Sequence, residues 1–317
     1  MANPTLEIAA KEFLLACRAD GLKPATMRWY RAMLKGLRTQ FYGKELTRID
    51  ANAMRRYITD LRERTNRYEA APQRPEVKGG LSHESLRAHL RCLRRFFHWA
   101  WTEYQLDPLS NPMLKIRMPG RERHEPKAIT VEDLDRILNA CDDSLAGIRD
   151  RAMLTFLADT GCRAGGLLGL RRVNLHIDEG YALVTEKGNR DRAVPFLAST
   201  GTLLREWLNV RPWDADPNFI FISLGSNTYG QPLSLSGLHQ ILKRLKKRAG
   251  VNGRVNPHSF RHGFARQYLA NGGDLATLSQ IMGHSDVSVT VGSYAIFKDR
   301  ELAAMHKKYS PMREKRG

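Results

Sequence analysis

A basic, proline-rich stretch divides this sequence into two parts. Residues 109–127 contain three prolines, one glycine and a dense run of basic residues. Proline cannot continue a helix and favours an extended chain, so this composition predicts a linker, which we place at residues 111–128. The chain of 317 residues is long enough to bury a separate core on each side of it. We therefore expect one domain at residues 1–110 and a second at 129–317.

Apolar residues recur at intervals of three to four along most of the chain, which is typical of amphipathic helices. In the first domain this spacing predicts helices at about 5–19, 25–41, 50–65 and 82–104. Residues 66–81 are polar and contain prolines and glycines, and they predict a flexible insertion.

The same spacing predicts a mostly helical second domain. We expect its helices at about 131–140, 145–160, 199–209, 234–249, 257–271, 274–283 and 286–293. Two β-rich runs, 181–185 and 193–196, lie on either side of a Lys-Gly-Asn turn and predict a hairpin. The expected fold class is therefore mainly α with one small β-sheet.

Both parts of the sequence are strongly basic. The formal net charge is +18, from 51 Lys and Arg residues against 33 Asp and Glu residues. Residues 1–120 hold 22 of the basic and 12 of the acidic residues, which leaves 29 and 21 for the rest of the chain. Positive charge in both parts indicates a polyanionic partner held from two sides, and double-stranded DNA fits this better than an acidic membrane surface.

Four arginines gather on the helix expected at 82–104, namely Arg87, Arg91, Arg94 and Arg95. Two interpretations are open: they form a solvated helix face, or the helix lies in a major groove where arginine meets guanine edges and phosphates. The net charge favours contact with DNA.

The remaining composition argues against several other classes of protein. Four scattered cysteines without C-x-x-C spacing predict reduced packing residues, not disulfides or zinc ligands. The sequence shows no N-terminal signal pattern and no apolar run near the about 18 residues that span a bilayer. We expect a cytoplasmic protein that binds no membrane and needs no metal and no cofactor.

Six side chains in the second domain form a set suited to attack on a phosphodiester: Arg163, Lys187, His258, Arg261, His284 and Tyr294. Arginines fork onto the two non-bridging phosphate oxygens. A lysine or histidine can protonate the departing oxygen, and a tyrosine hydroxyl can act as a covalent nucleophile. Each residue alone also has an ordinary structural interpretation, such as a helix cap, a solvated turn or a packed ring.

The segments around these residues resemble the tyrosine recombinases, also called the phage-integrase family. The matching stretches are, in order, Thr160–Arg163 with Leu167–Arg171, Lys187–Pro195, His258–Ala265, and Met282–Ser285 followed by Tyr294. Their order and separations agree with the family over roughly residues 150–310. The resemblance implies a helical core-binding (SAM-like) domain at the N-terminus and an α-helical catalytic domain. It also implies a C-terminal exchange segment, about 297–317, which in relatives docks on a neighbouring subunit. Two interpretations are open for this segment: docking on a neighbour, or packing within its own subunit.

The resemblance assigns the cations to the phosphate. Arg163 and Arg261 are expected to clamp it, and Lys187 to protonate the 5′ oxygen as that oxygen leaves. Arg190 and Arg192, beside the lysine, are expected to bind DNA phosphates.

The histidines and the tyrosine receive the other roles. His258 is expected to accept or donate a proton near the tyrosine hydroxyl, and His284 to bond a phosphate oxygen. His262 is assigned to packing beneath the site. Tyr294 is the expected nucleophile.

Two positions depart from the family pattern. Relatives usually carry an acidic residue where this chain has Gly166, and they place the tyrosine nine residues after the second histidine, where the gap here is ten. Tyr229 and Tyr309 are rival nucleophiles, but the first lies in a Gly/Asn loop and the second close to the end of the chain.

The resemblance implies a site-specific recombinase that acts as a homotetramer on two duplex sites, with accessory DNA-bending proteins as further partners. The reaction would pass through a 3′-phosphotyrosine intermediate and a Holliday junction. A mobile element or a resolution system is the favoured setting. Two other functions stay open: a type IB topoisomerase-like relaxation enzyme, and a non-cleaving DNA-binding protein derived from this fold.

Overall fold

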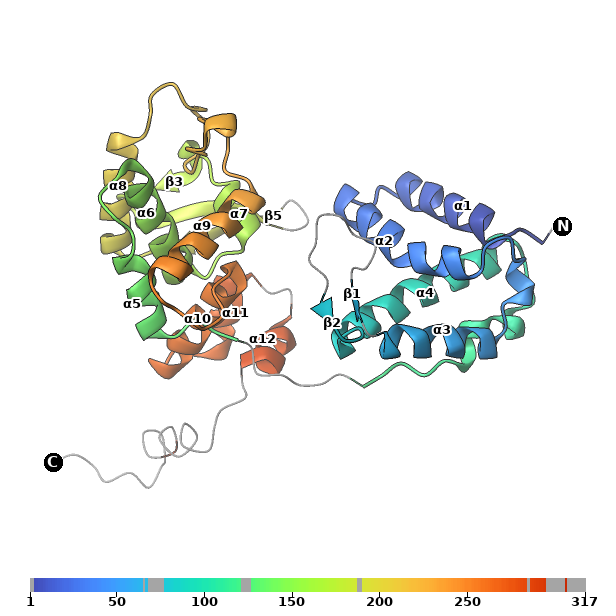
Figure 1. Cartoon of the computed structure of the whole chain (residues 1–317). Coiled ribbons are helices and arrows are strands. Elements are labelled where there is room, and N and C mark those ends of the chain that lie inside the picture. The colour runs from blue at the N-terminus through green and yellow to red at the C-terminus, as the bar shows by residue number, and fades with distance from the viewer. Residues whose placement is uncertain are drawn as a thin grey trace. The chain divides into compact units, whose positions relative to one another are not determined.

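The computed structural model describes residues 3–64, 66–67, 77–120, 127–186, 190–283, 286–294 and 306. The chain forms two compact units, Met1–Arg123 and His124–Gly317, each with its own hydrophobic core (Figure 1). The division falls within the stretch that the sequence assigns to the linker. Part of that stretch nevertheless packs on the first unit, because Met113 of the 3-10 helix Pro112–Lys115 and the following Ile116 are buried in its core.

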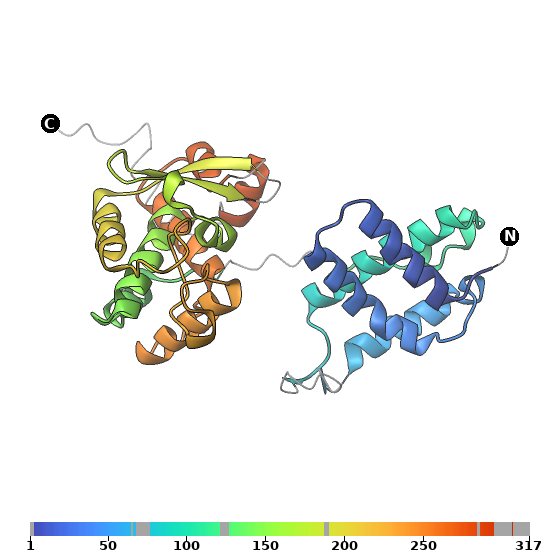
Figure 2. The same cartoon turned by 90° about the horizontal axis from the view of Figure 1, so that it is seen from above.

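Four helices build the first unit: α1 (Leu6–Ala19), α2 (Pro24–Gln40), α3 (Ala51–Glu63) and α4 (His83–Glu103). The side chains of Asp50 and Ser82 accept hydrogen bonds from the first turns of α3 and α4, which fixes where these helices begin. Helices α1 and α2 contact each other, and both contact α4 (Figure 2). Phe13, Leu34 and Phe96 fill the core between their apolar faces.

The insertion predicted at 66–81 begins and ends in a short antiparallel ladder. Strand β1 (Asn66–Arg67) pairs with β2 (Val77–Lys78), and residues 68–76 lie outside the described residues. The remaining elements of this unit are the 3-10 helices Leu46–Arg48 and Pro108–Ser110.

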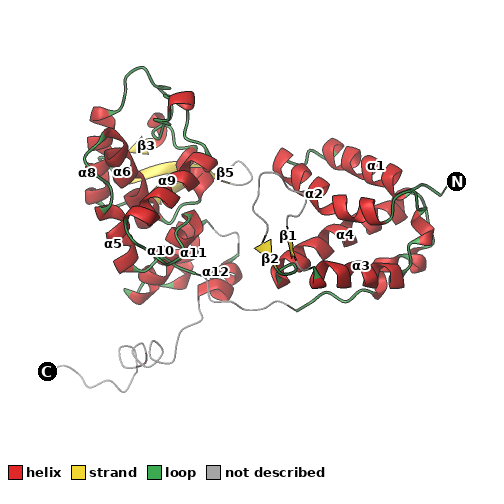
Figure 3. Cartoon of the chain, viewed as in Figure 1, coloured by secondary structure: helices red, strands yellow, loops and turns green. Residues whose placement is uncertain are grey.

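The second unit is a helical domain with one small sheet (Figure 3). Its helices are α5 (Val131–Asn139), α6 (Leu145–Thr160), α7 (Ala164–Leu168), α8 (Ala198–Val210), α9 (Leu235–Arg248), α10 (Pro257–Ala270), α11 (Leu275–Met282) and α12 (Val287–Tyr294). Strands β3 (Leu175–His176), β4 (Tyr181–Glu186) and β5 (Arg190–Pro195) form an antiparallel sheet in that order, and the predicted hairpin is β4–β5. The fold class of mainly α with a small sheet in the second domain is confirmed, and the two-stranded β1–β2 ladder of the first unit is an addition to it.

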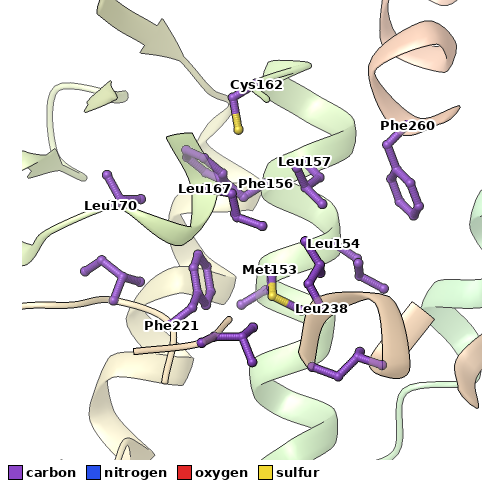
Figure 4. Packing of buried hydrophobic residues seen from close by; sticks show 14 of the residues in the cluster. Met153, Leu154, Phe156, Leu157, Cys162, Leu167, Leu170, Phe221, Leu238 and Phe260 are labelled. Atoms are coloured by element: carbon purple, nitrogen blue, oxygen red, sulfur yellow. The ribbon is translucent and has the colours of Figure 1, made fainter. Parts of the chain in front are cut away.

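Helix α6 forms the centre of this unit's core. Its Met153, Leu154, Phe156 and Leu157 pack against apolar side chains from the segment after α6, from α7, α9 and α10, and from the loop that carries Phe221 (Figure 4). Burying one such side chain stabilises the fold by about 1.5–3 kcal/mol. The helix is therefore held rigidly, and its C-terminal end is a fixed point from which the next residues are placed.

Four described elements of the second unit have no counterpart in the sequence prediction. They are the five-residue helix α7, the two-residue strand β3 and the 3-10 helices Arg172–Asn174 and Ser226–Thr228. All four cysteines are buried as free thiols. Among the residues that the structure describes, no helix combines the length and the apolar character needed to cross a lipid bilayer.

Candidate active site

Arg163 follows a turn that requires glycine. Helix α6 ends at Gly161, whose backbone is left-handed with φ 57°, a conformation that residues with a side chain rarely adopt. A Cβ atom at this position would also lie 2.5 Å from the ring of Phe264. The turn places Arg163 at the start of α7, half-buried. Burial lowers the pKa of its guanidinium, and the charge of Arg192 adds to this effect.

Arg261 connects three segments of the second unit. Helix α10 begins at a capping box formed by Asn256 and Ser259, with Pro257 in its first turn. From this helix Arg261 donates hydrogen bonds of 2.7 Å to the carbonyl of Gly161 and 2.6 Å to the carbonyl of Met282. Its side chain is buried, with 4% of its surface exposed. Burial and the charge of Arg163 lower the pKa of Arg261 to about 10, so the guanidinium stays charged at pH 7.

Tyr294 is buried at the end of α12, with 7% of its surface exposed. Its ring packs against a small apolar cluster formed by residues of α10 and α11, namely Ala265, Leu269, Leu278 and Met282. Burial raises the pKa of the Tyr294 hydroxyl, and the charges of Arg261 and Arg163 oppose that shift. The phenol therefore lies within the electrostatic reach of both arginines.

The histidine that meets this hydroxyl is His262. Its Nδ1 lies 2.7 Å from the Tyr294 Oη, whereas the ring of the exposed His258 has its centroid 6.4 Å from that of His262. The sequence assigned the proton-handling position to His258 and a packing role to His262. Residues 258 and 262 are one helical turn apart on the same face of α10, and α12 docks against the second of them.

Of the predicted cations around the turn between β4 and β5, Arg192 is the one whose side chain the structure describes. Arg192 of β5 is half-buried and donates a hydrogen bond to the carbonyl of Ile281 at the end of α11. Arg190 begins β5, and its side chain lies outside the description. Lys187 and His284 also fall outside the described residues.

The arginines of α4 are not equivalent. Arg91, Arg94 and Arg95 are exposed, and Arg95 lies over the ring of Tyr30 with its Cζ atom 5.8 Å from the ring centroid. Arg94 donates a hydrogen bond of 2.6 Å to the carbonyl of Ile116.

The side chain of Arg87 makes its contacts within the first unit. It donates a 2.6 Å hydrogen bond to the carbonyl of Pro119 and pairs with Glu84 at 3.6 Å, and 12% of its side chain is exposed. Arg91 is therefore more accessible to DNA than Arg87.

Gly166, which stands where relatives usually have an acidic residue, is buried against the sheet. A Cβ atom here would lie 3.2 Å from the Cβ of Val184 in β4 and 3.4 Å from its Cγ2. This is closer than ordinary van der Waals contact. The backbone of α7 lies close to the strand at the point where a carboxylate side chain would otherwise stand.

This helical unit, with its small sheet and its tyrosine beside paired arginines and histidines, has the architecture of a tyrosine recombinase. A family model described as the phage integrase family matches residues 127–300, more than half of the chain, and the chain belongs to that family. It is accordingly a site-specific recombinase, an enzyme that cleaves DNA and transfers strands.

Comparisons with individual proteins agree. The chain is 30% identical over 285 residues to the tyrosine recombinase XerD of Listeria monocytogenes serotype 4b (strain F2365), covering 83% of this chain and 94% of that one. The match to a structure of the XerH site-specific recombinase bound to its difH substrate covers 95% of this chain and 84% of the XerH chain, with a TM-score of 0.67 and 18% identity. The match to the integrase of transposon Tn1549 in complex with a circular intermediate DNA covers 95% of this chain and 99% of the integrase chain, with a TM-score of 0.72 and 17% identity. The two structural likenesses show the fold.

Proposed function

We propose that this recombinase cuts DNA by attack of the Tyr294 hydroxyl on a backbone phosphorus, which forms a 3′-phosphotyrosine link. The observation that supports this most strongly is the placement of Tyr294. The charges of Arg163 and Arg261 both act to lower the pKa of its hydroxyl. These two arginines come from elements about 100 residues apart in sequence. Positive charge around a phenol favours the phenolate and attracts the phosphate that the phenolate attacks.

The other roles in the proposed reaction follow the family pattern. Arg163 and Arg261 stabilise the charge on the non-bridging oxygens, and Lys187 protonates the 5′ oxygen as it departs. The family pattern gives His284 a hydrogen bond to a phosphate oxygen and gives His258 a proton-handling role near the tyrosine hydroxyl. Because the bond energy is kept in the protein–DNA ester, strand exchange proceeds without ATP.

We further propose that four copies act on two duplex sites, with two rounds of single-strand exchange through a Holliday junction. XerH and the Tn1549 integrase, which share the fold, are both bound to DNA in their structures. A cavity of about 530 Å³ supports the assembly: Ile129, Phe260, Phe264 and Tyr268 contribute its apolar lining. We propose that it receives apolar side chains of the exchange segment 297–317 from a neighbouring copy.

The setting that we propose is a mobile element or a resolution system, with accessory DNA-bending proteins as further partners. The insertion at 66–81 and the glycine at position 166 distinguish this chain from the usual family pattern. The likeness to a transposon integrase over nearly all of both chains is compatible with this setting.

The test begins with duplexes that the chain retains from a random-sequence pool. Each retained duplex is nicked so that cleavage releases a short oligonucleotide, and the reaction is examined for a protein–DNA adduct that survives denaturation. We expect an adduct with the unaltered chain and none with Tyr294→Phe. Tyr229→Phe is the matched control, because this tyrosine is half-exposed in a loop, and it should form adduct normally.

Three outcomes would contradict the proposal. An adduct that persists in Tyr294→Phe would move the nucleophile to another residue. Tight binding without any adduct would identify a non-cleaving DNA-binding protein. Relaxation of supercoiled plasmid by a monomer, with no exchange between two sites, would identify a topoisomerase-like enzyme.

A further inference from the structure

His262 Nδ1 and Tyr294 Oη lie 2.7 Å apart and share a hydrogen bond whose direction depends on the imidazole tautomer. We assign the tautomer in which Nδ1 accepts the phenol proton. An imidazole that accepts at Nδ1 is neutral and carries its own proton on Nε2. Burial lowers the pKa of His262 to about 4, and the charges of His258, Arg261 and Arg254 add to this effect. The ring is therefore neutral at pH 7, so Nδ1 can accept a proton, and its lowered pKa makes it a weak base while no anion is bound.

We propose that His262 is the catalytic base that takes the proton from Tyr294 during attack and returns it during rejoining. This inference rests on the proposed function. As the Oη–P bond forms, the Oη proton moves to His262 Nδ1, the P–O5′ bond breaks, and the O5′ takes a proton from Lys187. In rejoining, an incoming 5′ hydroxyl gives its proton back to Lys187 and forms the new P–O bond. Tyr294 then leaves and recovers its proton from the imidazolium.

His258 is less well placed for this task. It is exposed and its ring lies a helical turn from the ring that reaches the hydroxyl. Among the described residues, His262 Nδ1 lies within hydrogen-bond distance of Tyr294 Oη. General bases act within hydrogen-bond distance of the proton that they remove, and His262 meets this condition.

The charges around His262 connect its basicity to the presence of DNA. The cations that oppose its protonation are Arg261 on its own helix and Arg254 before that helix, and His258 opposes it when its own ring is protonated. A phosphodiester bound among them would offset their charge and raise the affinity of Nδ1 for a proton. The base therefore becomes more effective when its substrate has arrived.

Two substitutions separate proton transfer from positioning. Asparagine places an amide atom near the position of Nδ1 and can hold the phenol, but it cannot take up a proton, whereas alanine does neither. We expect His262→Asn and His262→Ala both to slow adduct formation by about 10²-fold or more on the nicked, retained duplex. Binding of the intact duplex should be unchanged. The acidic limb of the pH–rate profile should disappear in His262→Asn. Should the asparagine variant fold poorly, His262→Gln serves as the second non-titrating replacement.

A duplex with sulfur in place of the bridging O5′ completes the test, because a thiolate leaves without being protonated. On this duplex we expect Lys187→Ala to regain most of its lost rate and His262→Asn to stay slow. The inference is overturned if His262→Asn forms adduct at the rate of the unaltered chain, or if sulfur restores its rate. An unaltered chain that forms no adduct on any retained duplex would remove the proposed function, and the inference with it.

Discussion

Arg261 donates a hydrogen bond of 2.7 Å to the main-chain carbonyl of Gly161, a residue one hundred positions earlier. Gly161 forms the turn that leads into Arg163, so the second arginine of the site holds the turn that places the first. Because another N–H of Arg261 binds the carbonyl of Met282 at the end of α11, the same guanidinium also anchors the approach to the nucleophile's helix. One side chain therefore organises the site before any DNA is bound.

The structural role of Arg261 should be measurable without a substrate. Lysine keeps the charge, but its single ammonium cannot reproduce the planar fork that reaches both carbonyls. Leaving one buried carbonyl unsatisfied costs about 1–3 kcal/mol, so we expect Arg261→Lys to lower the free energy of unfolding by about that amount. Urea denaturation monitors the change. Arg254→Lys, at an exposed position in the loop before α10, should change it little, and equal stability of the two variants would contradict this role.

The packing of Gly166 predicts opposite effects at neighbouring glycines. A Cβ at position 166 would press on Val184, and overpacking of this kind costs about 1–3 kcal/mol. A Cβ at the exposed Gly165 meets nothing within 4 Å, and alanine in a helix is favoured over glycine by about 0.5–1 kcal/mol. We expect Gly166→Ala to lower the melting temperature and Gly165→Ala to raise it slightly. A melting temperature for Gly166→Ala at or above that of Gly165→Ala would contradict this prediction, because it would show that β4 shifts enough to accommodate the added methyl group.

The buried His89 should make the first unit sensitive to mild acid. Burial lowers its pKa to about 4, and its Nε2 lies 3.2 Å from the hydroxyl of Tyr57. The unfolded chain, with an ordinary histidine pKa near 6.5, therefore binds the proton first as the pH falls, and stability declines between about pH 6.5 and 4.

This loss of stability amounts to about 2 kcal/mol between pH 7 and pH 5. Urea denaturation at the two pH values should show that His89→Gln, which cannot titrate, loses less stability than the unaltered chain. His98→Gln, at an exposed position on the same helix, should keep the full loss. An unchanged pH dependence in His89→Gln would place the effect elsewhere.

Two arginines of α4 should affect DNA binding differently. Binding that depends on cations at phosphates weakens as salt rises, and removing one such cation reduces the slope of log K against log salt by about 1. We expect Arg91→Gln to reduce that slope by about 1 without altering stability, because Arg91 is exposed. Arg87→Gln should keep the slope but destabilise the first unit by about 1–2 kcal/mol, because it loses the bond to Pro119. Fluorescence anisotropy from about 50 to 200 mM salt measures the slopes, and urea denaturation measures the stabilities. A smaller slope for Arg87→Gln together with lower stability for Arg91→Gln would contradict these assignments.

The sequence predicted the longer helices and the β4–β5 hairpin because each repeats its apolar pattern over two or more turns or pairs. Helix α7 and strand β3 are too short for a period to be recognised, and they form because tertiary contacts hold them. The position of Gly166 against Val184 likewise depends on how α7 lies on the sheet. Local sequence contains no information about that approach.

The site shows the same limit. The resemblance identified Tyr294, Arg163 and Arg261, which the structure brings together. It did not predict that His262, rather than His258, meets the hydroxyl, since both residues lie on one helix face and only the docking of α12 selects between them. The hydrogen bond from Arg87 to the carbonyl of Pro119 could not be predicted from the sequence either. Its acceptor is a backbone carbonyl, which any residue type can supply.

The shelter around Tyr294 has a consequence for the enzyme when it is away from DNA. With only 7% of its surface exposed, the phenol is shielded from water and from small electrophiles that modify accessible tyrosines. The reactive oxygen is therefore protected from side reactions while the enzyme is away from DNA, and the charges of the two arginines that would receive a phosphate already act on it.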